Sequence, residues 1–304
     1  MKVIFGDAGA VLPSLEADSV DSVVTSPPYW RLRDYGVPGQ VGQEETLDQY
    51  LGTLRALFGE VRRVLKPTGT CWVNIGDCYA CASKPAVDPY RCTTSGKLMP
   101  PQGRAPVPDG LQAKSLIGLP WRVAMALQQD GWVLRNAVVW HKPNGMPESV
   151  RDRFAGKYEY VFLLAKSPRY YFNLDAVRTD RGANPGDVWS IPTRPSGVGH
   201  FAVMPTELVR RCLQAGCPRW VCAKCGLPAE GDWCRCGEGA GRRPAVVLDP
   251  FVGSGTTLLV ARELGLEGVG IELNPEYESV MRKRLGAGNV LLPDVSFHCF
   301  REGE

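Results

Sequence analysis

One stretch near the end of the chain limits the possible folds more than any other feature of this 304-residue sequence. Residues 245–249 form a short apolar run that predicts a buried strand, and a glycine-rich turn then leads into a helix ending near Leu264. A second strand is predicted at 268–272 and a second helix at 275–285. Because a strand–helix–strand order brings parallel strands together, the sequence predicts an α/β protein.

The amino-terminal half repeats this alternation. Short buried strands are predicted at 3–5 and 22–25. Thr46 pairs with Gln49 in a capping box, and apolar residues then recur every three or four positions as far as Leu65, which predicts an amphipathic helix. Further strands are expected at 70–75, 133–140, 158–164 and 170–172, the last two forming a hairpin, and further helices at 119–129 and 205–215.

Composition excludes several protein classes. Hydrophobic residues make up 44% and charged residues 22% of the chain, values typical of soluble globular proteins rather than of disordered or fibrous ones. No apolar run approaches the ~18 residues that span a bilayer, and the amino-terminal residues lack the apolar core of a signal peptide. The cytosol is the expected compartment. The net charge of +3 is too small to indicate a nucleic-acid partner by itself.

The first candidate motif is Asp249-Pro-Phe-Val-Gly-Ser-Gly-Thr-Thr257, where a predicted strand opens into a helix. Its glycines let a ligand approach the backbone, and the start of the helix offers unpaired N–H groups. Glu272 ends the next strand, about twenty residues farther on, where a carboxylate can accept hydrogen bonds from a ribose diol. This spacing fits NAD, FAD or any adenosyl cofactor, and it matches neither the triple-glycine Rossmann fingerprint nor the P-loop.

The second candidate motif is Thr25-Ser26-Pro27-Pro28-Tyr29-Trp30, at the end of another predicted strand. The two prolines fix φ and remove two backbone donors, so a stiff turn presents carbonyl acceptors beside a hydroxyl and an aromatic ring. This combination suits an amino group on a flat ring. Taken alone, the same residues also fit a rigid turn with a buried tyrosine.

Together the two motifs resemble those of the DNA amino-methyltransferases, which transfer the methyl group of S-adenosylmethionine to an exocyclic base nitrogen. The catalytic motif precedes the cofactor motif, an order that resembles the β class of that family. Other segments that resemble the family, in the expected order, are Gly6-Asp7, Asn74-Ile75-Gly76-Asp77, Trp140-His141-Lys142-Pro143-Asn144, Tyr158-Glu159-Tyr160-Val161-Phe162 and Gly199-His200-Phe201.

The resemblance implies a circularly permuted, Rossmann-like class I methyltransferase sheet of seven mostly parallel strands, in a single catalytic domain over 1–304 with a cofactor-binding unit at 245–290. It also implies the S-adenosylmethionine contacts. Residues around the methionine part are Asp249, Phe251, Gly253, Ser254, Gly255 and Thr256. Glu272 binds the ribose, and Asp7 lies near the adenine. Asp7 also fits the alternative role of N-cap for a helix that starts at Ala8.

In the same reading, the catalytic residues are Ser26, Pro27, Pro28 and Tyr29. The Ser26 hydroxyl and the Pro27 carbonyl accept hydrogen bonds from the amine, which localises its lone pair, while the flipped base stacks on Tyr29. Transfer is direct and in line, without a covalent enzyme intermediate. Serine before Pro-Pro-Tyr resembles the cytosine-N4 enzymes more than the adenine-N6 enzymes, and adenine N6 is the alternative.

Duplex DNA is the expected partner, and two polar loops, 82–114 and 141–157, are the expected recognition region. Candidate DNA-binding residues are Arg31, Arg33, Lys142, Arg151 and Arg153 for phosphates, and Asn144 for base edges. A cognate restriction endonuclease is possible, and the sequence leaves open whether the protein is a monomer or a homodimer.

The 11 cysteines are clustered, since five of them fall between Cys217 and Cys236. A small Cys-rich insertion at 217–240 is predicted to bind a structural zinc ion through four thiolates. The expected ligands are Cys222, Cys225, Cys234 and Cys236. Cys217 could replace one of them, and a metal-free insertion is the alternative.

Three other functions compete with this hypothesis. A similar sheet methylates RNA or protein, but the permuted motif order favours DNA. Cytosine-C5 methylation needs an attacking thiolate, usually in a Pro-Cys turn, and the sequence has only the reverse order, Cys217-Pro218. A non-catalytic zinc-bearing DNA-binding module would explain the cysteines and the loops, but it would leave both strand-end motifs without a function.

Overall fold

The computed structural model describes residues 1–82, 91–92, 98–99, 105–193, 204–286 and 295–301. Its strands are β1 (Lys2–Phe5), β2 (Val20–Thr25), β3 (Leu65–Ile75), β4 (Arg91–Cys92), β5 (Leu98–Met99), β6 (Val133–His141), β7 (Tyr158–Ala165), β8 (Val188–Ser190), β9 (Trp220–Cys222), β10 (Arg242–Pro244), β11 (Val246–Asp249), β12 (Glu267–Glu272) and β13 (Ser296–Cys299). Its α-helices are α1 (Ala8–Val11), α2 (Leu47–Val64), α3 (Leu119–Gln129), α4 (Thr206–Gly216), α5 (Thr256–Glu263) and α6 (Glu278–Arg284).

Within the described residues the main sheet has nine strands, in the order β13-β1-β12-β11-β2-β3-β7-β6-β8. All neighbours from β13 to β3 are parallel, whereas β7 lies antiparallel to both β3 and β6. The expected mostly parallel α/β sheet is confirmed. Seven of these strands form its interior, and β13 and β8 form its two edges.

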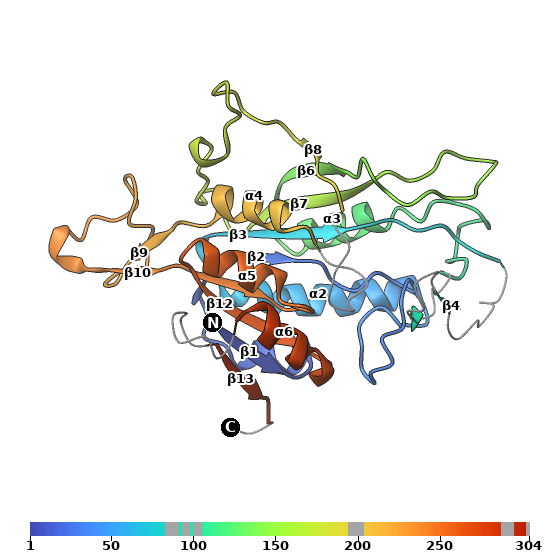
Figure 1. Cartoon of the computed structure of the whole chain (residues 1–304), viewed down its shortest axis with the longest axis horizontal. Helices are drawn as coiled ribbons and strands as arrows, with labels where there is room; N and C mark the ends of the chain where they lie inside the picture. The colour runs from blue at the N-terminus through green and yellow to red at the C-terminus, as the bar shows by residue number, and fades with distance from the viewer. Residues whose placement is uncertain (83–90, 93–97, 100–104, 194–203, 287–294, 302–304) are drawn as a thin grey trace.

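Helices cover both faces of the sheet (Figure 1). The helices α1, α2 and α3 pack in one apolar cluster with the strands, and α4 and α5 pack in a second cluster on the other face. The long helix α2 starts at the predicted capping box, in which Thr46 and Gln49 bond each other's backbone N–H groups. No helix in the described part of the chain combines the length and the apolar character needed to cross a membrane.

The permuted order places β2 beside β11 at the centre of the sheet, although their residues are more than two hundred positions apart. Val247 pairs with Ser22 and Leu248 with Val23 in a parallel register. The carboxyl ends of both strands therefore lie at the same end of the sheet. The two motifs that follow them, at Ser26 and at Gly253, begin side by side.

Three expectations need correction or restriction. Tyr170–Phe172 is not a strand, because the Tyr171 N–H bonds only to the Thr68 carbonyl and no ladder continues from it. Most of the expected loop 82–114 and the segment 199–201 lie outside the described residues, while β4 and β5 within that loop form a two-residue antiparallel pair. The helix expected at 275–285 begins with a 3-10 turn at Pro275–Tyr277 and continues as α6.

The Cys-rich insertion is attached at the amino ends of the central strands, whereas the two motifs follow the carboxyl ends. Lys66, at the start of β3, donates from Nζ to Asp21 Oδ1 at 2.6 Å and to the Gly226 carbonyl at 3.0 Å. The other oxygen of Asp21 accepts from the Val246 N–H at 2.9 Å. Lys66 and Asp21 are both buried. This ion pair fixes the insertion to the amino ends of β2, β3 and β11, and Figure 1 shows β9 and β10 projecting from that end.

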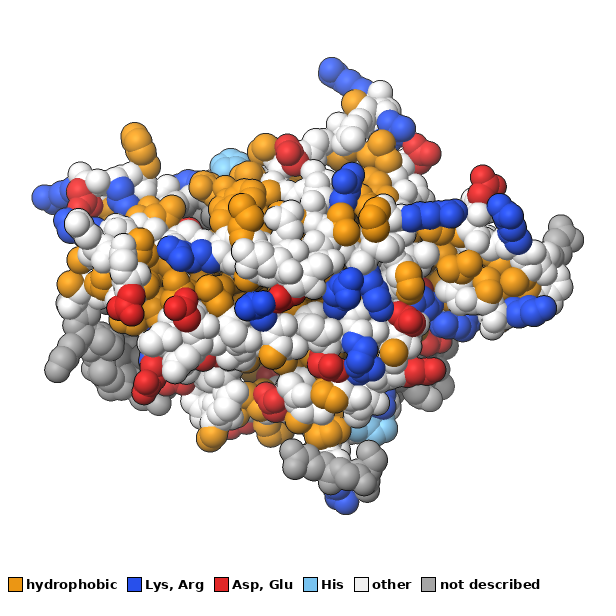
Figure 2. Space-filling view, turned by 180° about the vertical axis from the view of Figure 1, so that it is seen from behind, with side chains coloured by type: hydrophobic (Ala, Val, Ile, Leu, Met, Phe, Trp, Pro, Cys, Tyr) orange, Lys and Arg blue, Asp and Glu red, His pale blue; other side chains and the backbone are white. Residues whose placement is uncertain are grey.

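The surface carries no block of one charge sign on the face shown in Figure 2, where basic and acidic side chains are interspersed. This mixture agrees with the small net charge of +3. The charge of the whole molecule therefore does not by itself indicate a nucleic-acid partner.

Candidate active site

One buried carboxylate joins the two motifs. Asp249 Oδ1 accepts from Thr25 Oγ1 at 2.7 Å, just before the catalytic motif, and from the Phe251 N–H at 3.1 Å. Its Oδ2 accepts from Thr257 Oγ1 at 2.6 Å, at the last residue of the cofactor motif. Burial raises the pKa of Asp249 to about 6. Because both oxygens bond to the protein, Asp249 positions the two turns relative to each other.

The turn after β11 has the backbone shape expected for a ligand cradle. Gly253 and Gly255 have φ values of +52° and +82°, which side chains disfavour. The Gly253 N–H donates to Glu272 Oε2 at 2.9 Å, and the Asn274 N–H donates to Oε1 at 2.9 Å. Burial raises the pKa of Glu272 to about 7. The glycine turn and the acid at the end of β12 thus form one unit.

The other expected cofactor residues lie close to this unit. The Ser254 hydroxyl contacts Arg284 Nη1 at 2.5 Å, so it faces α6. Asp7 caps α1 by accepting from the Ala10 N–H at 3.1 Å, which confirms the capping role. It also lies beside Glu272, because the preceding Gly6 N–H donates to the Glu272 carbonyl. Contact of Asp7 with an adenine stays a prediction.

Two further cofactor candidates differ in exposure. Phe251 is partly exposed and packs on the first core cluster, whereas Thr256 is buried as the first residue of α5. Phe251 keeps part of its ring at the surface.

The catalytic turn is held by two tyrosines. Ser26 Oγ donates to the Tyr29 hydroxyl at 3.4 Å, and the Tyr29 hydroxyl donates to Glu159 Oε2 at 2.9 Å. The Tyr50 hydroxyl donates to the Pro28 carbonyl at 2.9 Å. A Cβ on Gly76 would lie 2.9 Å from the Tyr29 ring, so only glycine permits this packing at the end of β3. The serine and the aromatic ring are thereby fixed to the sheet.

Glu159 is the centre of this network. It accepts from Tyr29 and from Asn74 Nδ2, the latter at 3.0 Å, and it forms an ion pair with Lys142, whose ammonium lies 4.4 Å from the Trp140 ring centre. Burial and the neighbouring Glu159 raise the pKa of the Tyr29 hydroxyl well above its usual value. The hydroxyl therefore stays protonated and donates to Glu159.

Sequence analysis missed the roles of Glu159 and Asn74. The signal was one polar residue inside each of two apolar strands, Asn74 in Cys71-Trp-Val-Asn-Ile75 and Glu159 in Tyr158-Glu-Tyr-Val-Phe162. Buried polar groups require partners. That rule could have marked both residues, but it could not have identified Tyr29 as their common partner.

The expected DNA-binding residues are engaged in several ways. Lys142 belongs to the Glu159 network rather than to an open surface. The Asn144 amide binds Thr193, donating to its carbonyl at 2.7 Å and accepting from its N–H at 2.8 Å. Arg31 Nε donates to the Glu44 carbonyl at 3.0 Å. Asn144 would have to release Thr193 before it could bond a base edge.

Arg33 lies toward the cofactor side. Burial raises the pKa of the Tyr35 hydroxyl, with Arg33 lowering it and Glu272 raising it, so Tyr35 lies between these two charges. Tyr277 has the same neighbours. The loop after the catalytic motif therefore reaches the acid that was predicted to bind ribose.

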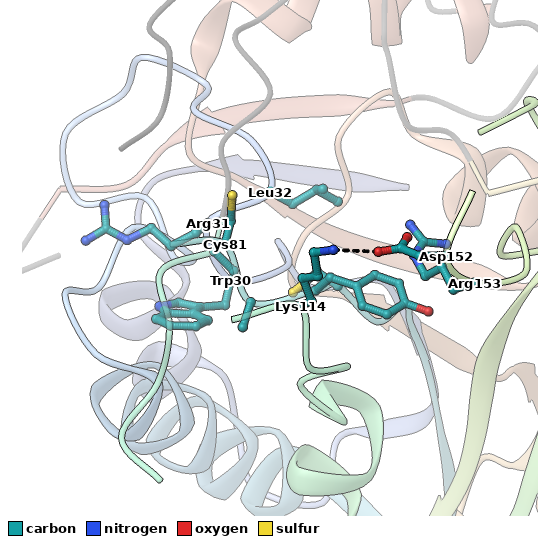
Figure 3. Close-up of a pocket in the computed structure, with 11 residues that line it drawn as sticks. Trp30, Arg31, Leu32, Cys81, Lys114, Asp152 and Arg153 are labelled. Carbon is teal, nitrogen blue, oxygen red and sulfur yellow. Dashed lines mark hydrogen bonds and ion pairs between the residues drawn. The ribbon is translucent and has the colours of Figure 1, made fainter. Parts of the chain in front are cut away.

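A cavity of about 480 Å³ opens directly behind the catalytic turn (Figure 3). Its lining comes from the segment after Tyr29, the residues that follow β3, and the loop between β6 and β7. In it, Lys114 Nζ pairs with Asp152 at 2.6 Å, and the Arg153 guanidinium lies 3.9 Å from the Tyr79 ring centre. This cavity connects the expected recognition loop 141–157 to the catalytic motif.

The four expected zinc ligands meet in the insertion. The sulfur atoms of Cys222, Cys225, Cys234 and Cys236 all lie within 4.8 Å of one another. Tetrahedral zinc with Zn–S bonds of about 2.3 Å needs sulfur separations of roughly 3.8 Å, so the arrangement fits such an ion. Cys217 is not in this group and is buried in the second core cluster.

Comparison with known proteins agrees with the geometry. The family model N6_N4_Mtase, described as DNA methylase, matches residues 20–283. The chain belongs to the DNA methylase family. Within that family it is a β-class DNA amino-methyltransferase, as the motif order predicted.

Type II methyltransferases are similar to this chain over nearly its whole length. It is 43% identical to the Type II methyltransferase M.SmaI of Serratia marcescens over 290 residues, covering 93% of this chain and 90% of that protein. It is also 43% identical to the Type II methyltransferase M.Cfr9I of Citrobacter freundii, covering 92% and 86% of the two chains.

Two solved structures share the fold. The PvuII DNA methyltransferase (cytosine-N4-specific) superposes with a TM-score of 0.66 at 19% identity, covering 95% of this chain and 87% of that one. A putative DNA modification methylase from Thermus thermophilus, complexed with S-adenosyl-L-methionine, gives 0.60 at 23% identity, covering 99% of each chain. The methylase sheet is therefore that of known DNA methyltransferases.

Replacement of Glu159 by Gln tests the network. Glutamine cannot accept from both Tyr29 and Asn74 and also neutralise Lys142, so we expect kcat for DNA methylation to fall about 10–100-fold through misplacement of Tyr29. Cofactor affinity should stay unchanged, because Glu159 lies on the catalytic side. The matched control is Glu60→Gln, which breaks a surface ion pair with Arg63 on α2. An unchanged kcat in Glu159→Gln would refute the role.

Proposed function

We propose that this methylase transfers a methyl group from S-adenosylmethionine to the exocyclic N4 of cytosine in double-stranded DNA, with the target base flipped out of the duplex. The observation that carries the proposal is the Thr25–Asp249–Thr257 set of hydrogen bonds. These bonds hold the catalytic turn and the glycine turn at one edge of the sheet. An amino group at Ser26 would therefore face a cofactor held at Gly253.

The residues at the glycine turn fit S-adenosylmethionine, which supplies the methyl group when bound. Gly253 and Gly255 have positive φ values, so the turn holds a backbone shape that residues with a Cβ disfavour. Glu272 retains acceptor capacity beyond its two backbone partners, since a carboxylate has about four lone-pair sites. We assign the ribose diol to Glu272, the adenine side to Asp7 and the methionine side to the turn from Phe251 to Thr256.

The catalytic side supplies hydrogen-bond acceptors and a stacking surface. The Ser26 hydroxyl and the Pro27 carbonyl accept from the amine, which favours a pyramidal nitrogen with an available lone pair. Before DNA binds, Ser26 Oγ is occupied by Tyr29, at a weak 3.4 Å. Because Ser26 Oγ donates in that contact, its lone pairs can still accept from the amine, while Glu159 keeps the Tyr29 ring in place to stack on the base.

Positive groups near the cavity are assigned to the DNA backbone. Arg151 is exposed on the loop between β6 and β7, and Arg153 lines the cavity beside Arg31. We place phosphate contacts on these three arginines. The resemblance to Type II methyltransferases supports a cognate restriction endonuclease that cleaves the same DNA sequence.

Cytosine is proposed over adenine because serine precedes Pro-Pro-Tyr in this chain. The test is to incubate genomic DNA with the protein and deuteromethyl-labelled S-adenosylmethionine, digest it to nucleosides and separate these by mass. We expect labelled N4-methyl-2′-deoxycytidine, and we expect Ser26→Ala to lower the rate by about 10–100-fold. The matched control is Ser19→Ala, at an exposed hydroxyl.

Labelled N6-methyl-2′-deoxyadenosine would show that the target is adenine rather than cytosine. No labelled nucleoside from any DNA would refute the proposed function itself. Single-molecule sequencing of the product gives the modified position and its sequence context.

Cofactor affinity should depend on pH through Glu272. Its pKa of about 7 means that the acceptor carboxylate is present above pH 7 and lost below it. Affinity for S-adenosylhomocysteine should therefore be about tenfold weaker at pH 6 than at pH 8, as measured by calorimetry. Glu272→Gln should bind more weakly and lose this pH dependence, whereas the exposed Glu276→Gln should retain it. Identical pH profiles for wild type and Glu272→Gln would contradict the assignment.

Zinc is proposed as a structural ion of the insertion. Four thiolates in tetrahedral range are the donor set that zinc prefers, and the insertion has little apolar material to fold without it. The site lies at the amino ends of the strands, so the ion would not reach the reacting atoms. Its role would be to hold the β9–β10 hairpin against Lys66.

We expect about one zinc ion per chain by plasma emission spectroscopy, and its loss in the double variant Cys225→Ser/Cys234→Ser. The unfolding midpoint should fall by about 5 °C, while kcat at low temperature stays within about twofold because the two sites are remote. Cys299→Ser, at an exposed cysteine outside the cluster, is the control. If the purified wild-type protein contained no zinc, the zinc proposal would be wrong.

A further inference from the structure

The loop between β6 and β7 exposes an unusual aromatic side chain. Phe154 is 96% exposed and Met146 is 84% exposed, the two highest values among the large hydrophobic side chains of the described residues. Apolar side chains of this size are normally buried at least in part. Both side chains belong to the loop between β6 and β7 and are open to solvent there.

The backbone beneath Phe154 is held in place. Arg153 Nη1 donates to the Phe154 carbonyl at 3.0 Å and to Glu148 Oε2 at 2.5 Å, while its guanidinium stacks on Tyr79. The base of the loop is closed by the Lys142 N–H, which donates to the Lys157 carbonyl at 2.7 Å. The ring therefore projects from a fixed support.

This support belongs to the active-site rim. Arg153 lines the cavity that begins at Trp30, directly after Tyr29 (Figure 3). The same loop starts at Lys142, which binds Glu159 in the catalytic network. Phe154 thus projects from the same loop that carries one wall of the cavity and one member of the network.

The charge around Phe154 favours a polyanion. Lys142, Arg151, Arg153 and Lys157 provide four positive charges in the loop, against Glu148 and Asp152. Glu148 pairs with Arg153 and Asp152 with Lys114, and Lys142 is paired with Glu159. Within the described part of the chain, Arg151 and Lys157 form no ion pair and keep their positive charge for a polyanion. At the left of Figure 2, the end of the molecule that carries this loop shows basic and hydrophobic side chains side by side. A purely apolar protein partner would not need this charge.

We propose that Phe154 enters the base stack of duplex DNA at the place that the target base leaves. Apolar wedges inserted between base steps stabilise such distortions, and extrusion of a base leaves a gap of the right kind. The inference rests on the proposed function, since it requires a flipped base. The inference identifies the side chain that fills the gap left in the base stack. Neither of the two strand-end motifs supplies such a side chain.

The test compares two duplexes that contain the methylation site mapped by sequencing. In the first the target base is correctly paired, and in the second it faces a mismatched base, which is cheaper to extrude. We expect Phe154→Ala to lower kcat/KM about 10–50-fold on the paired duplex and less than about threefold on the mismatched one. Phe154→Leu, which keeps an apolar wedge, should retain most activity on both.

Phe172→Ala is the matched control, because Phe172 is also an exposed phenylalanine. Its neighbour Tyr171 bonds to Thr68 near the start of β3, at the end of the sheet opposite the two motifs. It should change neither rate. Because Phe154 is almost fully exposed, Phe154→Ala should leave the unfolding midpoint unchanged.

Equal losses on the two duplexes, or no loss on either, would overturn the proposal. Conversion of a dimer into a monomer by Phe154→Ala in sedimentation velocity, with equal effects on both duplexes, would assign the loop to contact between copies of the chain instead. Failure of the wild-type protein to methylate any DNA is a different result, because it refutes the proposed function rather than the wedge.

Discussion

The hydrogen bonds of Asp249 are the constraint on which the rest of the site depends. A carboxylate that is buried must be compensated by donors, and here the donors come from both motifs, Thr25 on one side and Thr257 on the other. Its raised pKa, about 6, records the cost of that burial. Since the bond from Thr25 forms only when β2 and β11 are adjacent, fold and site geometry are coupled through one group.

A second, partly buried acid performs the same task on the catalytic side. Glu159 gathers Tyr29, Asn74 and Lys142 from the ends of β2, β3 and β6, so the three strand ends are fixed relative to one another. The antiparallel direction of β7 is what permits this, because the start of β7 lies where its neighbours end. Because β7 runs in the opposite direction, its amino end, which carries Glu159, lies beside the carboxyl ends of β3 and β6.

Local features were predictable from the sequence, and features set by distant contacts were not. The capping box and apolar period located α2, and the close spacing of Cys222 to Cys236 located the thiolate cluster. The edge strands β8 and β13 are short and largely exposed, so no period marks them. Tyr170–Phe172 has strand-like composition, yet Tyr171 bonds Glu230 and Thr68 instead of a neighbouring strand. The role of Glu159 required knowledge of which strand ends meet.

The central pairing of β2 with β11 has a consequence for synthesis on the ribosome. Thr25 is made early, but its partner Asp249 follows 224 positions later. Until that segment emerges, β2 lacks its neighbour and the serine turn lacks its support. Contacts of such long sequence separation form late in folding. A chain that stops before Asp249 therefore lacks the carboxylate that joins the serine turn to the glycine turn.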